Sequence, residues 1–118
     1  MQPQEEARAL ARAAAELALG KKAEEVLVLD LTGLSPVCDF FVLCHGDSDV
    51  QVKAIADAII EGLAAEGHEP WHVEGHAGRT WILIDLVDVV VHVFHRETRL
   101  YYRLEDLWGD APREAFTD

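Results

Sequence analysis

Three histidines recur at four-residue intervals in the middle of the chain: His68, His72 and His76. On a helix this spacing would stack three imidazoles on one face, where they could bind zinc. Two glycines and a proline interrupt the stretch, however, and on a strand only His72, Glu74 and His76 share a face. We therefore expect exposed loop and strand histidines and assign no metal ligand, with a weak metal site at His72 and His76 as the alternative.

A second group combines two carboxylates with a histidine: Asp85, Asp88 and His92. Asp88 and His92 share one face of a predicted strand, and Asp85 lies one connection away. Such a group could hold a divalent cation or transfer protons. Nucleotidyl transfer would instead require an Asp-x-Asp pair on a strand beside a Gly-Ser loop, so that two metal ions bridge the phosphates.

The only Asp-x-Asp pair in the sequence is Asp47-Ser48-Asp49, at a predicted helix start. Acidic side chains at a helix N-terminus satisfy the helix dipole themselves and repel a phosphate. The chain also lacks a Gly-x-Ser-x-Gly motif, a Walker loop, a Cys-x-x-Cys pair and a dinucleotide fingerprint. We predict no catalytic residues, no enzyme activity and no cofactor; a metal-dependent nucleotidyltransferase-like enzyme is the alternative.

Aromatic and acidic residues gather in the last third of the chain. The stretch from Thr80 to His95 contains no Lys or Arg but includes Trp81, Asp85 and Asp88, and Tyr102 and Trp108 follow soon after. Aromatic side chains rimmed by acids are typical of a surface that binds a basic protein. Core packing is the alternative for both tryptophans, because large aromatic side chains are mostly buried.

The overall charge narrows the class of partner. The 118 residues carry 22 acids against 10 Lys and Arg, a formal net charge of -12. Binding to nucleic acid or to an acidic membrane needs a basic footprint, which this chain lacks. The N-terminal residues have neither the basic nor the apolar region of a secretory signal, so we expect a cytoplasmic protein.

Two cysteines, Cys38 and Cys44, lie six residues apart. If one strand contained both, they would point the same way and lie too far apart for a disulfide. We expect two reduced core residues.

Hydrophobic spacing predicts an α/β protein with one mixed sheet flanked by helices, a single-domain sandwich over residues 1–118. A Ser48-x-x-Gln51 capping box predicts the start of the second helix. We expect a compact part over about 5–112 and a loose tail over 113–118. In chain order, the predicted elements are a helix over 5–19, strands over 25–31 and 40–44, a helix over 48–67, strands over 71–74, 80–85 and 88–94, and a short helix over 100–108.

Several ordered motifs resemble the ribosomal silencing factor (Iojap-like) family, from the first helix to Ala111-Pro112. The motifs are Lys22-Ala23-Glu24-Glu25-Val26-Leu27-Val28-Leu29-Asp30-Leu31, Cys38-Asp39-Phe40-Phe41-Val42-Leu43-Cys44, Gln51-Val52-Lys53-Ala54-Ile55-Ala56-Asp57, Asp88-Val89-Val90-Val91-His92-Val93-Phe94 and Tyr102-Arg103-Leu104-Glu105-Asp106-Leu107-Trp108.

The resemblance implies a nucleotidyltransferase-like topology without catalytic residues, often dimeric. It also implies a factor that binds ribosomal protein fourteen of the large (50S) subunit, blocks association with the small subunit and represses translation under nutrient limitation. The residues that match recurrent family positions are Trp81, Asp85, Asp88, Tyr102, Trp108 and His92. We expect Trp81 to anchor the partner, Asp85 and Asp88 to pair with its Lys or Arg, and His92 to be buried in an orienting role.

Two departures from the family pattern stand out. The segment His45-Gly46-Asp47-Ser48-Asp49 replaces the usual Ser-Gly-Thr-Ser loop and its following basic residue, and Val87 stands where Gly is common before Asp88. The second departure is expected to alter the turn between Asp85 and Asp88.

Overall fold

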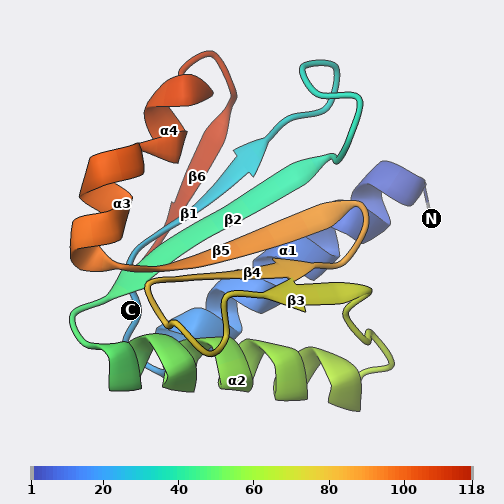
Figure 1. The fold of residues 1–118 in the computed structure, drawn as a ribbon. Coiled ribbons are helices and arrows are strands. Elements are labelled where there is room, and N and C mark those ends of the chain that lie inside the picture. The colour runs from blue at the N-terminus through green and yellow to red at the C-terminus, as the bar shows by residue number, and fades with distance from the viewer. Residues whose placement is uncertain (1, 118) are drawn as a thin grey trace.

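Runs of β-branched and apolar residues build a six-stranded sheet, and alanine-rich and amphipathic segments build its helices. The computed structural model describes residues 2–117 (Figure 1). Its elements in chain order are α1 (Pro3–Gly20), β1 (Glu24–Asp30), β2 (Phe40–Gly46), α2 (Asp49–Ala65), β3 (His72–Glu74), β4 (Trp81–Asp85), β5 (Val89–His95), α3 (Arg96–Tyr102), α4 (Leu104–Leu107) and β6 (Arg113–Phe116).

The strands lie in the order β3-β4-β5-β2-β1-β6. The central pair, β2 and β5, is parallel, and every other neighbouring pair is antiparallel. A parallel pair needs a long crossover, and α2 lies within that connection. The predicted α/β class with a mixed sheet flanked by helices is confirmed.

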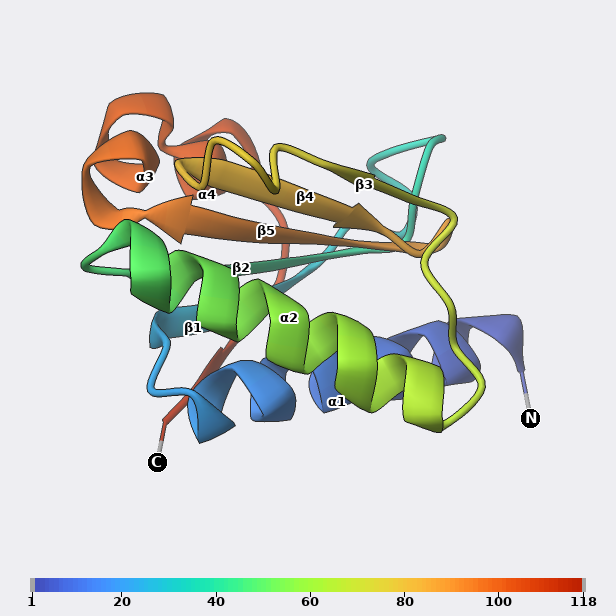
Figure 2. The same ribbon diagram turned by 60° about the horizontal axis from the view of Figure 1, so that its bottom comes forward.

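Helices α1 and α2 cover one face of the sheet (Figure 2). Small side chains let α1 approach closely, since its buried residues are all alanines, and α2 presents larger aliphatic side chains at helical spacing. Ser48 caps α2 as predicted, with its Oγ accepting a hydrogen bond from the Gln51 amide at 3.1 Å. No helix within residues 2–117 is long and apolar enough to cross a membrane.

The opposite face of the sheet is only partly covered. Helices α3 and α4 lie at one end of it, and no helix formed by residues 2–117 lies over β3 and β4 on that side (Figures 1 and 2). The side chains packed there include Phe41, Trp81, Leu83 and Trp108, all only partly buried. We call the surface formed by these four residues the open face.

The predicted loose tail is wrong for most of its length. Residues Arg113–Phe116 form β6, which pairs with Val26–Leu29 of β1, and the Asp30 amide donates to the Pro112 carbonyl at 2.8 Å. The segment has no apolar run of its own, so its strand structure depends on the hydrogen-bonding edge that β1 offers. Asp118, the last residue of the predicted tail, lies outside the described residues.

The predicted short helix over 100–108 is two helices. Arg103 separates α3 from α4 with a left-handed backbone, φ 48°. Its amide still donates to the Arg99 carbonyl at 2.9 Å, which closes the last turn of α3. This break turns the chain so that Leu104 and Trp108 pack against the sheet.

The two cysteines are free and buried, as expected, but they do not point the same way. Cys38 precedes β2 and packs with the residues under the open face, whereas Cys44 lies within β2 and faces α1 and α2. Burial raises the pKa of Cys44 to about 12. Burial and the nearby carboxylates of Asp39, Asp85 and Asp88 raise the pKa of Cys38 to about 11.

Candidate partner-binding face

A row of aromatic rings crosses the sheet along the open face. It begins at Trp81 in β4, continues through His92 in β5 and Phe41 in β2, and ends at Trp108 after α4. The His92 and Phe41 ring centroids are 4.5 Å apart, and those of Phe41 and Trp108 are 6.1 Å apart in an edge-to-face arrangement. Such contacts hold large apolar rings in fixed positions.

Trp81 is held on several sides. Its Nε1–H donates a hydrogen bond to His92 Nδ1 at 3.1 Å. The rings of Phe94 and Tyr102 each lie 4.9 Å from the Trp81 ring, centroid to centroid. Tyr102 is 49% exposed, so it borders the open face at the α3 end. A side chain whose rotamer is already fixed would lose little conformational entropy if a partner bound it.

His92 is buried, as predicted, and its Nδ1 accepts the hydrogen bond from Trp81. Burial lowers the pKa of His92 to about 4, so the ring is neutral at neutral pH. Because the indole N–H can only donate, Nδ1 accepts and the ring proton lies on Nε2. Nε2 is buried and has no hydrogen-bond partner within residues 2–117.

Asp85 and Asp88 lie at the other end of β4, away from Trp81. Asp85 Oδ1 accepts from the Val87 amide at 2.8 Å, and the Asp88 carbonyl accepts from the Asp39 amide at 2.8 Å. Val87 adopts φ 76°, a conformation that favours glycine, so the valine backbone is strained at this turn. The sequence grouped Asp85, Asp88 and His92, but within residues 2–117 they do not form a close set of possible metal ligands.

A family model described as "Ribosomal silencing factor during starvation" matches residues 4–118. The chain belongs to the ribosomal silencing factor family. It is 52% identical over 92 residues to the ribosomal silencing factor RsfS of Halalkalibacterium halodurans, covering 78% of this chain and 79% of the relative. Identity to RsfS of Bacillus subtilis is also 52% over 92 residues, covering 78% of each chain.

A crystal structure of a protein from Chromobacterium violaceum has the same fold as this family member. The TM-score is 0.84 at 35% sequence identity, and the match covers 92% of this chain and 88% of that chain. The resemblance found in the sequence motifs is therefore confirmed in both family membership and fold.

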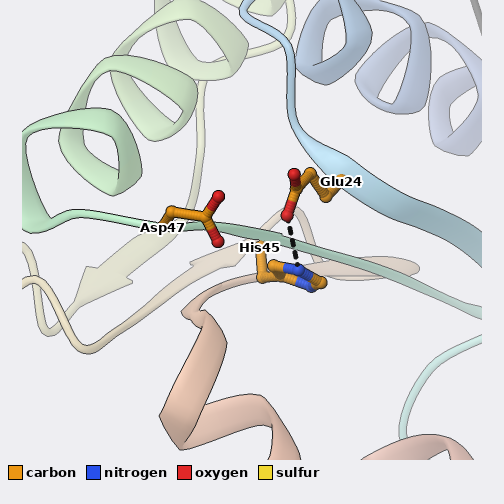
Figure 3. Close-up of side chains that lie close together, drawn as sticks. All are labelled: Glu24, His45 and Asp47. Carbon is orange, nitrogen blue, oxygen red and sulfur yellow. Dashed lines mark hydrogen bonds and ion pairs between the residues drawn. The ribbon is translucent and has the colours of Figure 1, made fainter.

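This silencing-factor chain has one further cluster that the sequence did not indicate. Glu24, His45 and Asp47 bring their possible ligand atoms within 4.8 Å of one another, the only such group in the part of the chain that the structure describes (Figure 3). His45 Nε2 and Glu24 Oε2 are 3.1 Å apart. Glu24 and His45 are paired residues of the antiparallel strands β1 and β2. Their contact therefore depends on the strand register, which the sequence does not specify.

Arg99 gives this cluster a structural role. Its buried guanidinium lies 3.1 Å from His45 Nδ1 and donates to the Glu25 carbonyl at 2.7 Å and to Glu105 at 3.3 Å. Burial and the neighbouring Arg99 charge lower the pKa of His45. Since Arg99 donates to one ring nitrogen and the other faces Glu24, both nitrogens are engaged, and the cluster joins α3 to β1 and β2 instead of offering a metal site.

The histidines at four-residue spacing, His68, His72 and His76, do not form one cluster in the structure. His72 Nε2 pairs with Glu74 Oε1 at 2.9 Å on the open side of β3. His76 lies beyond β3 and pairs with Asp57 of α2 at 2.7 Å. The expected shared face of His72 and His76 is therefore wrong, because β3 ends at Glu74 and Gly75 reverses the chain with φ 80°.

Proposed function

We propose that this protein binds the large ribosomal subunit through ribosomal protein fourteen of that subunit. There it would occupy the surface that meets the small subunit, block association of the subunits and repress translation under nutrient limitation. It acts as a cytoplasmic regulator without catalytic residues or cofactor, and it forms a homodimer when free.

The observation that carries this proposal is the open face of a strongly acidic family member. Trp81 and Trp108 are partly buried and Tyr102 is half exposed, so an aromatic surface remains available on one side of the sheet. A net charge of -12 repels ribosomal RNA and favours a basic protein on the same particle. A docked domain of this size would block subunit association by volume alone.

Co-sedimentation with purified large subunits tests the proposal. The wild-type protein should migrate with the large subunit and should reduce its association with added small subunits. In our proposal Asp85 and Asp88 pair with Lys or Arg of the partner, so the double variant Asp85→Lys/Asp88→Lys should lose binding. Wild-type protein that stays at the top of the gradient would overturn the proposal.

A matched control separates local contact from overall charge. Glu16 in α1 and Glu61 in α2 are exposed on the helices that cover the other face of the sheet. Glu16→Lys/Glu61→Lys changes the net charge by the same amount as the Asp85/Asp88 variant. If both double variants lose binding equally, the role of Asp85 and Asp88 is rejected.

The alternative of a metal-dependent nucleotidyltransferase-like enzyme has a separate test. Isothermal titration calorimetry with Mg²⁺ and nucleoside triphosphates should give no binding heat, and no nucleotide should turn over. The engagement of both His45 ring nitrogens by Arg99 and Glu24 supports this expectation.

A further inference from the structure

A small pocket opens beside Trp81 on the open side of β3 and β4. Its volume is about 280 Å³, and Glu74, Gly75, Trp81 and Leu83 line it. Glu74 lies opposite Leu83 in the antiparallel pairing of β3 with β4, so both side chains project from the same side of the sheet.

Gly75 shapes the pocket. A Cβ at this position would overlap the Trp81 carbonyl oxygen, so only glycine lets the chain after β3 pass this close to the start of β4. Its φ of 80° turns the chain immediately after Glu74. The close passage leaves Glu74, Trp81 and Leu83 around one opening.

The chemistry of the lining is amphipathic. Leu83 and Trp81 offer apolar surface, and Glu74 offers a carboxylate whose side chain is 64% exposed and whose Oε1 already pairs with His72. Lysine and arginine combine an apolar stem with a cationic head, and an aromatic ring beside a carboxylate attracts such a head. Glu74 is also nearer to Trp81 than Asp85 is, because its paired residue Leu83 is two residues from Trp81 and Asp85 is four residues from it.

We propose that this pocket takes a lysine or arginine side chain of the basic partner, with Glu74 as its counter-charge and Trp81 and Leu83 against its stem. This inference rests on the proposed function, since it assigns a further contact within the same binding face. It adds a third carboxylate to Asp85 and Asp88, opposite the middle of β4.

The dissociation constants of Glu74 variants for purified large subunits test the pocket. Glu74→Gln keeps the shape and removes the charge, and we expect binding about fivefold weaker. Glu74→Lys places a cation in the pocket, and we expect binding at least about thirtyfold weaker. Glu16→Lys, which makes the same change of net charge on the other side of the sheet, should alter binding less than about twofold.

Thermal unfolding and the NMR resonance of the Trp81 indole N–H, measured on each free variant, establish that the fold and the anchor are unchanged. If the wild type binds and Glu74→Lys weakens binding no more than Glu16→Lys does, the pocket is overturned and the proposed function stands. Absence of wild-type binding would overturn both. Weakening by Glu74→Lys that exceeds the control, with an unchanged indole resonance, supports the pocket.

Discussion

Ile82 and Leu83 are neighbours in β4, but they belong to two different environments. Ile82 is fully buried between the sheet and the helices α1 and α2, whereas Leu83 is only partly buried on the open face. One face of the sheet is thus covered by a closed, mainly aliphatic core, and the other has a smaller core with a partly uncovered aromatic surface. The comparison indicates that stability comes mainly from the first face and that the second is available for binding.

The largest expected effect is the difference in the free energy of unfolding lost by alanine variants of Ile82 and Leu83. Ile82→Ala should reduce the free energy of unfolding by about 3 kcal/mol, because it leaves a cavity in a closed core. Leu83→Ala should cost about 1 kcal/mol, since part of its side chain is already in water. Urea unfolding measures both values, and equal losses would mean that the two faces do not differ as described.

The next effect concerns acid stability. Burial lowers the pKa of His92 from 6.5 to about 4. As the pH falls below about 6.5, the unfolded chain takes up a proton at this histidine while folded His92 stays neutral. Its contribution to stability is therefore complete above that pH and is lost progressively as the pH falls toward about 4, by at most about 1.4 kcal/mol per pH unit.

Urea unfolding of wild type and His92→Leu at about pH 7 and about pH 5 measures this contribution. The variant should lose less stability on acidification than the wild type does. Because burial and Arg99 also lower the pKa of His45, some acid sensitivity remains in both proteins. If wild type and His92→Leu lose the same stability between these two pH values, His92 does not titrate in this way.

The smallest effect is the coupling between His92 and Trp81. Their hydrogen bond fixes the indole, so His92→Leu should weaken large-subunit binding about fivefold in the wild type, equivalent to about 1 kcal/mol. In a Trp81→Phe background, which lacks the indole donor, the same change should have less than about a twofold effect. His92→Gln, whose carbonyl oxygen accepts a hydrogen bond, should restore part of the loss and part of the indole N–H chemical shift.

Local sequence signals were sufficient for most of the fold. The spacing of apolar residues predicted α1 and α2, and Ser48 and Gln51 located the start of α2, because periodicity and capping depend on residues a few positions apart. The strand β6 could not be predicted in this way. Its sequence has little strand signal, and the partner that orders it is β1, more than eighty residues earlier.

The sequence suggests residues for the candidate site but only part of their geometry, and their role in binding stays a prediction. Trp81 and His92 were both identified, yet their hydrogen bond follows from the register of β4 with β5, which the sequence does not specify. Asp85 and Asp88 are separated from Trp81 because β4 runs from one end of the sheet to the other. The sequence marks Glu74 only as a neighbour of histidines, because its place beside Trp81 depends on the turn at Gly75.

The two outermost strands have a consequence for how this protein behaves in a crowded solution. β3 has three residues and β6 has four, and both include charged side chains, so neither border offers a long apolar ladder to another chain. Without β6, the outer side of β1, seven residues with Val26-Leu27-Val28-Leu29 at its centre, would be exposed. By pairing with β1, the short strand β6 prevents β1 from pairing with another chain, the first step of intermolecular β-aggregation.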